Sequence, residues 1–261
     1  MGILNVTPDS FSDGGKFNRL DLAVKHIHSM LENGADIIDI GGESTRPGSD
    51  PVSTNEELNR IIPIINEVKK TSNDILVSVD TYKSAVAKEA IKAGADIIND
   101  ISGLAFDQDM APLLAKNDIP VIIMHIQGKP KTMQQNISYN DLINDIKQYF
   151  KIRCDYAIKS GIKKNNIILD PGIGFGKTFN HNYELLKNLK IFKDMAYPLL
   201  IGPSRKAFIG DVLKLPPEER VEGTIATVVA GILNGANIVR VHDVKENKRA
   251  ITVTENILAA K

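Results

Sequence analysis

The sequence predicts a (β/α)8 TIM barrel that forms a single domain over residues 1–261. Short apolar segments alternate eight times with segments of helical periodicity, and such alternation builds parallel sheets through right-handed crossovers. One phrase also recurs, as Gly-Ala-Asp-Ile-Ile at 34–38 and 94–98 and as Gly-Ala-Asn-Ile-Val at 235–239, which indicates a reused helix-to-strand unit. Finally, the length suits a fold that typically takes about 250 residues. An open doubly wound sheet is the alternative, but no G-x-G-x-x-G fingerprint follows the first strand.

Each expected strand is short and apolar, and each expected helix has a periodic apolar face. The first helix, Leu20–Asn33, places Leu22, Ile27, Met30 and Leu31 roughly on one side and ends at Gly34. The strands are expected at 2–6, 37–39, 75–79, 97–99, 121–124, 167–170, 198–201 and 238–240. Helices are expected at 20–33, 58–70, 85–93, 110–116, 142–160, 183–189, 222–233 and 244–259, with one more opening after Lys206.

The composition is that of an ordinary globular protein and argues against several classes of partner. Lys+Arg and Asp+Glu are balanced at 32 each, so no overall basic field favours nucleic acid or an acidic membrane surface. Cys154 is the single cysteine, which excludes an intrachain disulfide. No apolar run reaches membrane-spanning length, and no charged segment precedes an apolar core at the N-terminus. We therefore expect a cytoplasmic protein in which any anion-binding site is local.

Polar side chains end nearly every expected strand. In a barrel of this type the active site lies at the carboxyl ends of the strands, so these side chains are candidates for chemistry. Part of the set could instead cap the helices that follow. The set comprises Asn5, Asp39, Asp80, Asn99, His125, Asp170, Ser204, Arg240 and His242.

Asp80, Asn99 and Asp170 form the most informative group. The apolar run 167–169 leads directly into Asp170, and the following proline keeps this residue extended at the strand end. Two carboxylates and an amide at one barrel mouth suit a flat heterocycle that carries several N–H donors. Because buried carboxylates repel one another, a cation is expected between them, and Lys206 is the available one. Capping and turn formation remain the alternative role for Asp170.

The eighth strand suggests an anion site. Arg240 and His242 are two residues apart and therefore face the same way, so they can hold one anion together. Asn5 lies beside them if the first strand closes against the last, and an amide oxygen with phosphate oxygens and water suits Mg²⁺. The sequence has no zinc-type His/Cys spacing, no Walker A motif, no serine nucleophile elbow and no catalytic cysteine context.

Two loops after the first and second strands combine proline, glycine and hydroxyl side chains with functional groups. They cover residues 7–15, with Phe11 and Asp13, and residues 41–48, with Thr45 and Arg46. Such loops above a barrel are candidate lids, although ordinary flexible loops have the same composition.

Seven segments of the chain resemble the motifs of dihydropteroate synthases, in the right order and over essentially the whole length. The match of eleven consecutive residues in the first segment makes the resemblance specific. The segments are Asn5–Gly15, Gly42–Gly48, Ser78–Thr81, Ile98–Asp100, Leu169–Lys177, Ser204–Lys206 and Arg240–Asp243.

The resemblance implies a Mg²⁺-assisted transferase of folate synthesis, which joins 6-hydroxymethyl-7,8-dihydropterin diphosphate to 4-aminobenzoate and releases pyrophosphate. It implies that Asp80, Asp170, Lys206 and Asp13 act in catalysis and that Asn5 contacts the metal. The implied contacts to the pterin diphosphate are Asn5, Thr45, Asp80, Asn99, Asp170, Lys206, Arg240, Val241 and His242. The implied contacts to 4-aminobenzoate are Phe11, Thr45, Arg46, Pro47, Phe175, Ser204 and Ala207.

One departure and two alternatives accompany the resemblance. Family members often have serine where this chain has Ala207, so the 4-aminobenzoate carboxylate would depend more on Ser204 and on backbone N–H groups. A pterin-dependent methyltransferase or a non-catalytic pterin-binding module on the same barrel would share the carboxylates, but neither needs the diphosphate contacts. The resemblance also implies a homodimer formed through the last helices, although packing against the barrel explains the apolar faces of these helices equally well.

Overall fold

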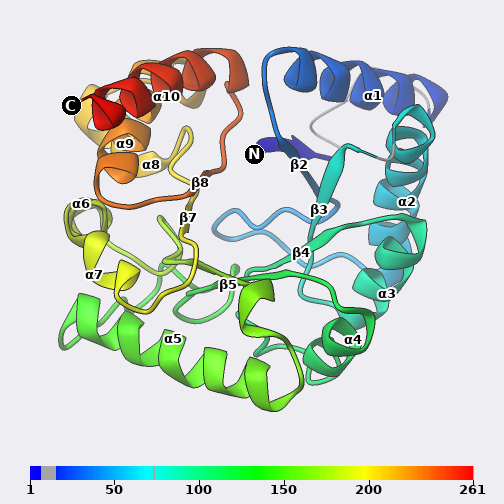
Figure 1. Cartoon of the computed structure of the whole chain (residues 1–261), viewed down its shortest axis with the longest axis horizontal. Helices are drawn as coiled ribbons and strands as arrows, with labels where there is room; N and C mark the ends of the chain where they lie inside the picture. Colours follow the sequence, from blue (N-terminus) through cyan, green and yellow to red (C-terminus); the bar gives the residue numbers. More distant parts are fainter. Residues whose placement is uncertain (7–15, 73, 261) are drawn as a thin grey trace.

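The computed structural model describes residues 1–6, 16–72 and 74–260, and it shows a ring of strands surrounded by helices (Figure 1). The strands are β1 (Gly2–Asn5), β2 (Ile37–Gly41), β3 (Leu76–Asp80), β4 (Ile97–Asp100), β5 (Val121–Met124), β6 (Ile167–Asp170), β7 (Leu200–Ile201) and β8 (Ile238–Val239). The α-helices are α1 (Lys16–Glu32), α2 (Thr54–Thr71), α3 (Ser84–Ala93), α4 (Met110–Asn117), α5 (Leu142–Lys159), α6 (Phe179–Asn188), α7 (Lys190–Lys193), α8 (Ala207–Leu213), α9 (Val221–Leu233) and α10 (Val244–Ala259).

The eight strands close into a barrel. Strands β1 to β6 pair in parallel in chain order, and β7 pairs in parallel with β8. The parallel bridge between Leu169 and Leu199 joins the two groups on one side, and the bridge between Gly2 and Val241 joins them on the other. The expected TIM barrel is therefore confirmed, and the open doubly wound sheet is excluded.

The helix boundaries differ from the expected ones mainly at N-terminal turns. Helix α2 begins at Thr54, four residues before the first apolar position, because the Ser53 side chain accepts a hydrogen bond from the Glu56 N–H and caps a polar first turn. In α1 the buried positions are Ala23, Ile27 and Met30, whereas Leu22 is 42% exposed and was wrongly expected on the buried face. The four-residue helix α7 has too few residues for periodicity to reveal it.

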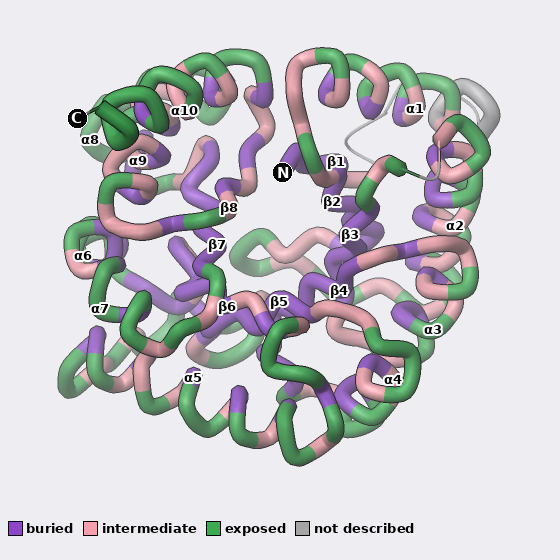
Figure 2. Tube along the Cα trace, in the orientation of Figure 1, coloured by how far each residue is buried: buried purple, intermediate pink, exposed green. Residues whose placement is uncertain are grey.

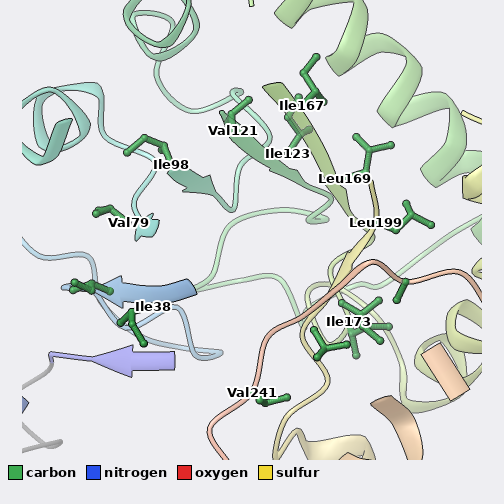
Figure 3. Packing of buried hydrophobic residues seen from close by; sticks show 14 of the residues in the cluster. Ile38, Val79, Ile98, Val121, Ile123, Ile167, Leu169, Ile173, Leu199 and Val241 are labelled. Carbon is green, nitrogen blue, oxygen red and sulfur yellow. The ribbon is translucent and has the colours of Figure 1, made fainter. Parts of the chain in front are cut away.

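Successive strand side chains point alternately outward, toward the helices, and inward, into the barrel. The inward apolar side chains lie near the amino ends of the strands, so the carboxyl end of the barrel is polar. One set of strand residues, which includes Ile38, Val79, Ile98 and Val121, packs in the large core cluster under the helices (Figure 3). The opposite set forms a separate apolar cluster inside the barrel. Its members are Met1, Ile37, Ile97, Ile122, Ile168, Leu200 and Ile238, all in the amino-terminal parts of their strands or just before them.

The burial pattern follows from this arrangement. The strands form the buried inner ring in Figure 2, whereas exposed segments lie mainly on the outer surfaces of the helices and in loops. Within the described residues, none of the helices combines the length and the apolar character needed to cross a membrane.

Candidate active site

The register of the first four strands places polar residues side by side at the barrel mouth. Asn5 is paired with Gly41, Gly41 with Asp80, and Asp80 with Asn99. A Cβ atom on Gly41 would lie 3.6 Å from both Asn5 Oδ1 and the Asp80 Cβ. The glycine therefore leaves open the space between the amide of Asn5 and the carboxylate of Asp80.

A buried charge cluster lies at the centre of this region. The Arg240 guanidinium donates from Nε to Asp39 Oδ2 at 2.5 Å and from Nη2 to Asp80 Oδ2 at 2.9 Å. Asp39 also accepts from the Ser78 hydroxyl at 2.6 Å. Burial raises the pKa of Asp80 to about 7, and the Arg240 charge opposes that rise.

Arg240 is therefore a cation at the mouth in addition to the one expected at Lys206, and it lies between the buried carboxylates of Asp39 and Asp80. The expectation that Arg240 and His242 hold one anion together stays a prediction. Their side chains have different partners in the structure: Arg240 contacts the two aspartates, whereas His242 Nδ1 is 3.0 Å from the Ser204 hydroxyl.

Asn99 presents an acceptor without a partner. Its Nδ2 donates to Asp39 Oδ2 at 3.3 Å, which fixes the orientation of the amide. The other amide atom, Oδ1, is buried and has no hydrogen-bond partner among the described residues. An unpaired buried acceptor costs about 1–3 kcal/mol, so this atom indicates a place where a ligand donor belongs.

Asp170 ends β6 and is held by the glycine-rich loop that follows. Its Oδ1 accepts from the Gly172 N–H at 2.7 Å. Gly172 has a φ of +69°, and a Cβ there would lie 1.9 Å from the His125 carbonyl oxygen, so no other residue fits. Burial raises the pKa of Asp170, while the Gly172 N–H and the charges of Lys206 and Arg240 oppose the rise.

Lys206 comes from the loop after β7 and reaches across to the same glycine-rich loop. Its ammonium donates to the carbonyl of Ile173 and lies 4.5 Å from the centroid of the Phe175 ring. Desolvation lowers the pKa of Lys206 to about 7, although the Asp170 and Asp80 charges oppose this lowering. The structure therefore brings Lys206 close to the Phe175 ring and near the Asp170 carboxylate.

The ends of β7 and β8 are tied to each other. The His242 N–H donates to the Ser204 hydroxyl at 3.1 Å, and Arg205 pairs with Asp243 with an Nε–Oδ2 distance of 2.9 Å. Burial, together with the charges of Arg205 and Arg240, lowers the pKa of His242 to about 4, so this imidazole is neutral at pH 7. Ser204 is buried and therefore sits below the surface of the mouth.

Val241 lies apart from the other expected contacts. Its side chain belongs to the core under the helices. Its backbone groups close the barrel, because its N–H donates to the Met1 carbonyl and its carbonyl accepts from the Ile3 N–H, both at 3.0 Å. The structure therefore does not bring Val241 into the mouth.

The loop after β2, drawn in light blue, projects onto the centre of the ring of strands in Figure 1. Thr45 is half-buried, whereas Arg46 and Pro47 are exposed. The Arg46 charge helps to lower the pKa of His242, which places this loop near the end of β8. Ala207 is exposed at the first position of α8, next to Lys206.

Phe11 and Asp13 lie outside the described residues. The sequence interpretation included Asp39 among the strand-end candidates without a specific role and gave no role to Lys177, and the structure places these residues at the centre of the mouth and beneath it. A signal for Asp39 was present: Asp39, Asn99 and Arg240 occupy the same position in the three copies of the repeated phrase. In the barrel Asp39 accepts hydrogen bonds from both Asn99 and Arg240.

Comparisons with known proteins agree on one family. Residues 1–242 match the family model described as pterin binding enzyme. A dihydropteroate synthase of Clostridium beijerinckii is 54% identical over 99% of this chain and 93% of that protein. The crystal structure of the Clostridium difficile dihydropteroate synthase in the presence of pteroic acid superposes with a TM-score of 0.93 at 52% identity, covering 98% of this chain and 95% of that one. The Xanthomonas albilineans enzyme with 4-aminobenzoic acid gives a TM-score of 0.94 at 39% identity, covering 100% and 93%.

Proposed function

The chain belongs to the dihydropteroate synthases of the pterin-binding enzyme family, and we propose that the carboxyl end of its barrel performs their reaction as follows. The reaction condenses 6-hydroxymethyl-7,8-dihydropterin diphosphate with 4-aminobenzoate to give 7,8-dihydropteroate and pyrophosphate in folate biosynthesis. The single observation that carries the assignment of the site is the unpaired buried Oδ1 of Asn99, which lies in the same mouth as the Asp80 and Asp170 carboxylates.

The pterin ring binds among these acceptors. Asp170 and Asn99 accept from the N–H and NH₂ groups of the ring, and Asp80 supplies a second carboxylate at the mouth. The ring fits because it brings several donors in one plane and thereby satisfies acceptors that are costly to bury unpaired. Lys206 lies over the Phe175 ring at one side of this position and can donate to ring acceptors.

The diphosphate binds near the ends of β1 and β8. Arg240 uses Nε and Nη2 on the aspartates, and a guanidinium has five N–H donors, so further donors can face phosphate oxygens. His242 is neutral and can donate a hydrogen bond from one ring nitrogen.

We propose Mg²⁺ at Asn5 Oδ1. This oxygen faces the space above Gly41, and a neutral amide oxygen with phosphate oxygens and water is a ligand set that Mg²⁺ accepts. Among the described residues no group of three or more His, Cys, Asp or Glu side chains could hold a metal, which fits an ion that takes most of its ligands from the substrate. When bound, the ion would neutralise the leaving diphosphate.

The 4-aminobenzoate binds between the β7 end and the two long loops. Ser204 and the backbone around Ala207 would hold its carboxylate, and Phe175 would contact its ring. Thr45, Arg46 and Pro47 lie in the loop over the mouth and would complete the pocket. On the basis of the sequence motif alone, Phe11 would contribute to the same pocket and Asp13 would act in catalysis.

The residues at the mouth suit a substitution in which the C–O bond breaks before the amine attacks. The electron-rich pterin stabilises the developing positive charge, and the carboxylates of Asp170 and Asp80 add to that stabilisation. Arg240 and Lys206 stabilise the leaving diphosphate. No covalent nucleophile is required, and the described residues of the mouth offer donors and acceptors instead.

The test of this function is pyrophosphate release with the dihydropterin diphosphate and Mg²⁺, in the presence or absence of 4-aminobenzoate. The proposal predicts 7,8-dihydropteroate formation that depends on 4-aminobenzoate. Tight pterin binding with no turnover would favour a non-catalytic pterin-binding module instead. Methyl transfer from a methylated pterin would favour a methyltransferase.

We also propose a homodimer formed through the last helices, in a cytoplasmic protein. Helices α8 to α10 expose large apolar side chains, of which Val212, Val253 and Ile257 are each more than 60% exposed. Sedimentation should give twice the mass of 28.6 kDa for the wild type and the single mass for Ile257→Glu. A monomeric wild type would contradict the proposal.

A further inference from the structure

The glycine-rich loop after β6 is held by a row of side-chain donors. Four consecutive carbonyl groups, those of residues 173–176, each accept a hydrogen bond from a different side chain. The donors are Lys206 at 173, Gln134 at 174 (2.6 Å), Lys177 at 175 (2.9 Å) and Tyr139 at 176 (2.7 Å). Left-handed glycines at 172, 174 and 176 allow successive carbonyls to point in different directions.

Lys177 is the buried residue among these four donors. Its side chain is 2% exposed, although lysine is almost never fully buried unless it is paired with a charge. No carboxylate of the described residues lies within ion-pair distance of its ammonium group. Instead, Nζ lies 2.9 Å from His125 Nδ1 and 3.4 Å from the His125 carbonyl oxygen.

His125 is suited to accept from this lysine. It follows β5 and is enclosed by the Tyr149 ring, with centroids 4.8 Å apart, and by the Tyr139 ring at 6.0 Å. Burial, reinforced by the Lys177 charge, lowers the pKa of His125 to about 2, so its imidazole is neutral. A neutral imidazole whose Nδ1 faces an amine donor accepts there and carries its proton on Nε2.

We propose that Lys177, held by His125, is a positioning residue. It fixes the glycine-rich loop in the position from which Lys206 and Asp170 contact the pterin. The proposal rests on the function proposed above.

The glycine-rich loop contacts both Lys206 and Asp170 through its backbone. The Ile173 carbonyl, two residues from the Lys177 acceptor at Phe175, receives the Lys206 ammonium. The Gly172 N–H, at the start of the same loop, fixes the Asp170 carboxylate. Loss of the Lys177 donors leaves the part-buried Phe175 carbonyl without its partner, so the loop shifts to expose this carbonyl to water, and both pterin contacts move with it. The loop after β2, which carries Thr45 and Arg46, is anchored elsewhere, at Glu43.

The experiment compares Lys177→Met with the wild type and with Lys151→Met, a matched control on the exposed surface of α5. Methionine keeps the length and apolar character of the buried stem but removes the donors. We expect the KM for the dihydropterin diphosphate, and the Kd for a pterin measured by calorimetry, to rise about tenfold or more. The KM for 4-aminobenzoate should change less than about threefold, since its contacts lie outside the loop except for Phe175. Lys151→Met should match the wild type.

A second pair of variants separates positioning from simple loss of packing. In His125→Asn the amide oxygen can take the place of Nδ1 as the acceptor, whereas His125→Leu has no acceptor. We expect His125→Leu to weaken pterin binding and His125→Asn to restore most of it. If Lys177→Met fails to fold, the comparison of the two His125 variants still tests whether Lys177 positions the loop.

Three results would overturn the inference: an unchanged pterin Kd in folded Lys177→Met, an equal rise in the KM of both substrates, or equal behaviour of the two His125 variants. A wild type that makes no dihydropteroate would contradict the proposed function instead. The calorimetric Kd of the pterin would then still test the role of Lys177 in binding.

Discussion

Replacing Asn99 with leucine should weaken pterin binding without destabilising the ligand-free protein. Leucine has nearly the same shape as asparagine, so the change removes polarity and little packing. It removes the buried, unpaired Oδ1, which costs about 1–3 kcal/mol in the ligand-free state. It also removes the 3.3 Å hydrogen bond to Asp39, whose net contribution is about 0.5–1.5 kcal/mol. Asp39 keeps its bonds to Ser78 and Arg240.

Removing the unpaired Oδ1 stabilises the variant, and losing the bond to Asp39 destabilises it by a similar or smaller amount. We therefore expect a free energy of unfolding between unchanged and about 2 kcal/mol higher. Pterin binding should fall about 10- to 100-fold, because the ligand donor loses its acceptor. Urea unfolding measures the first quantity and calorimetric titration with a pterin the second. A loss of more than about 2 kcal/mol of stability would show that Oδ1 was already satisfied, and unchanged pterin binding would refute the assignment of Asn99.

Three further predictions concern other parts of the site. Lys206→Met should abolish synthase activity and stabilise the ligand-free protein. The folded-state pKa of Lys206 is lowered from 10.5 to about 7, so the unfolded state binds more protons between these pH values. The free energy of unfolding of the wild type should therefore rise by up to about 4 kcal/mol relative to this variant as pH rises from 7 to 10.5. A difference in urea unfolding that does not change with pH would contradict this. Lys83→Met should lower the free energy of unfolding by about 3–5 kcal/mol at pH 7, because Glu43 and Glu57 then stay buried without their cation. Because burial raises the pKa of Glu57, that loss should shrink as the pH falls through this raised pKa and the carboxylate becomes neutral, and a loss that does not change with pH in thermal unfolding would exclude charge as its cause. Ala207→Ser should tighten 4-aminobenzoate binding about fivefold by adding a hydroxyl donor, and equal binding constants would refute the role given to this position.

The sequence was sufficient to predict the barrel because its signals are local and repeated. The recurring phrase at 34, 94 and 235 and the apolar runs between glycine stops define eight strand units without knowledge of contacts. Helix starts were less predictable. In α2 a capping serine and a polar first turn precede the first apolar residue, so periodicity begins one turn late.

The candidate residues were predictable by type and strand end, but their partners were not. Arg240 was expected to hold an anion with His242, and only the closed barrel shows that it lies between Asp39 and Asp80. These partners are 160 or more positions away in the chain. The role of Lys177 could not be predicted for the same reason, because its acceptor His125 lies in the loop after β5, 52 positions away in the chain, and the sequence carries no sign that this lysine is buried.

The most direct test of the account is the affinity of the chain for a pterin when the Asp170 carboxylate is replaced by an amide. Asp170→Asn keeps the shape of the side chain but places a donor where the account requires an acceptor for ring N–H groups. The exposed Asp194, at the end of α7, provides the matched control Asp194→Asn. Calorimetric titration should show pterin binding weakened about 100-fold or more in Asp170→Asn and unchanged in Asp194→Asn. Equal binding by Asp170→Asn and the wild type would contradict the claim that this end of the barrel holds the pterin.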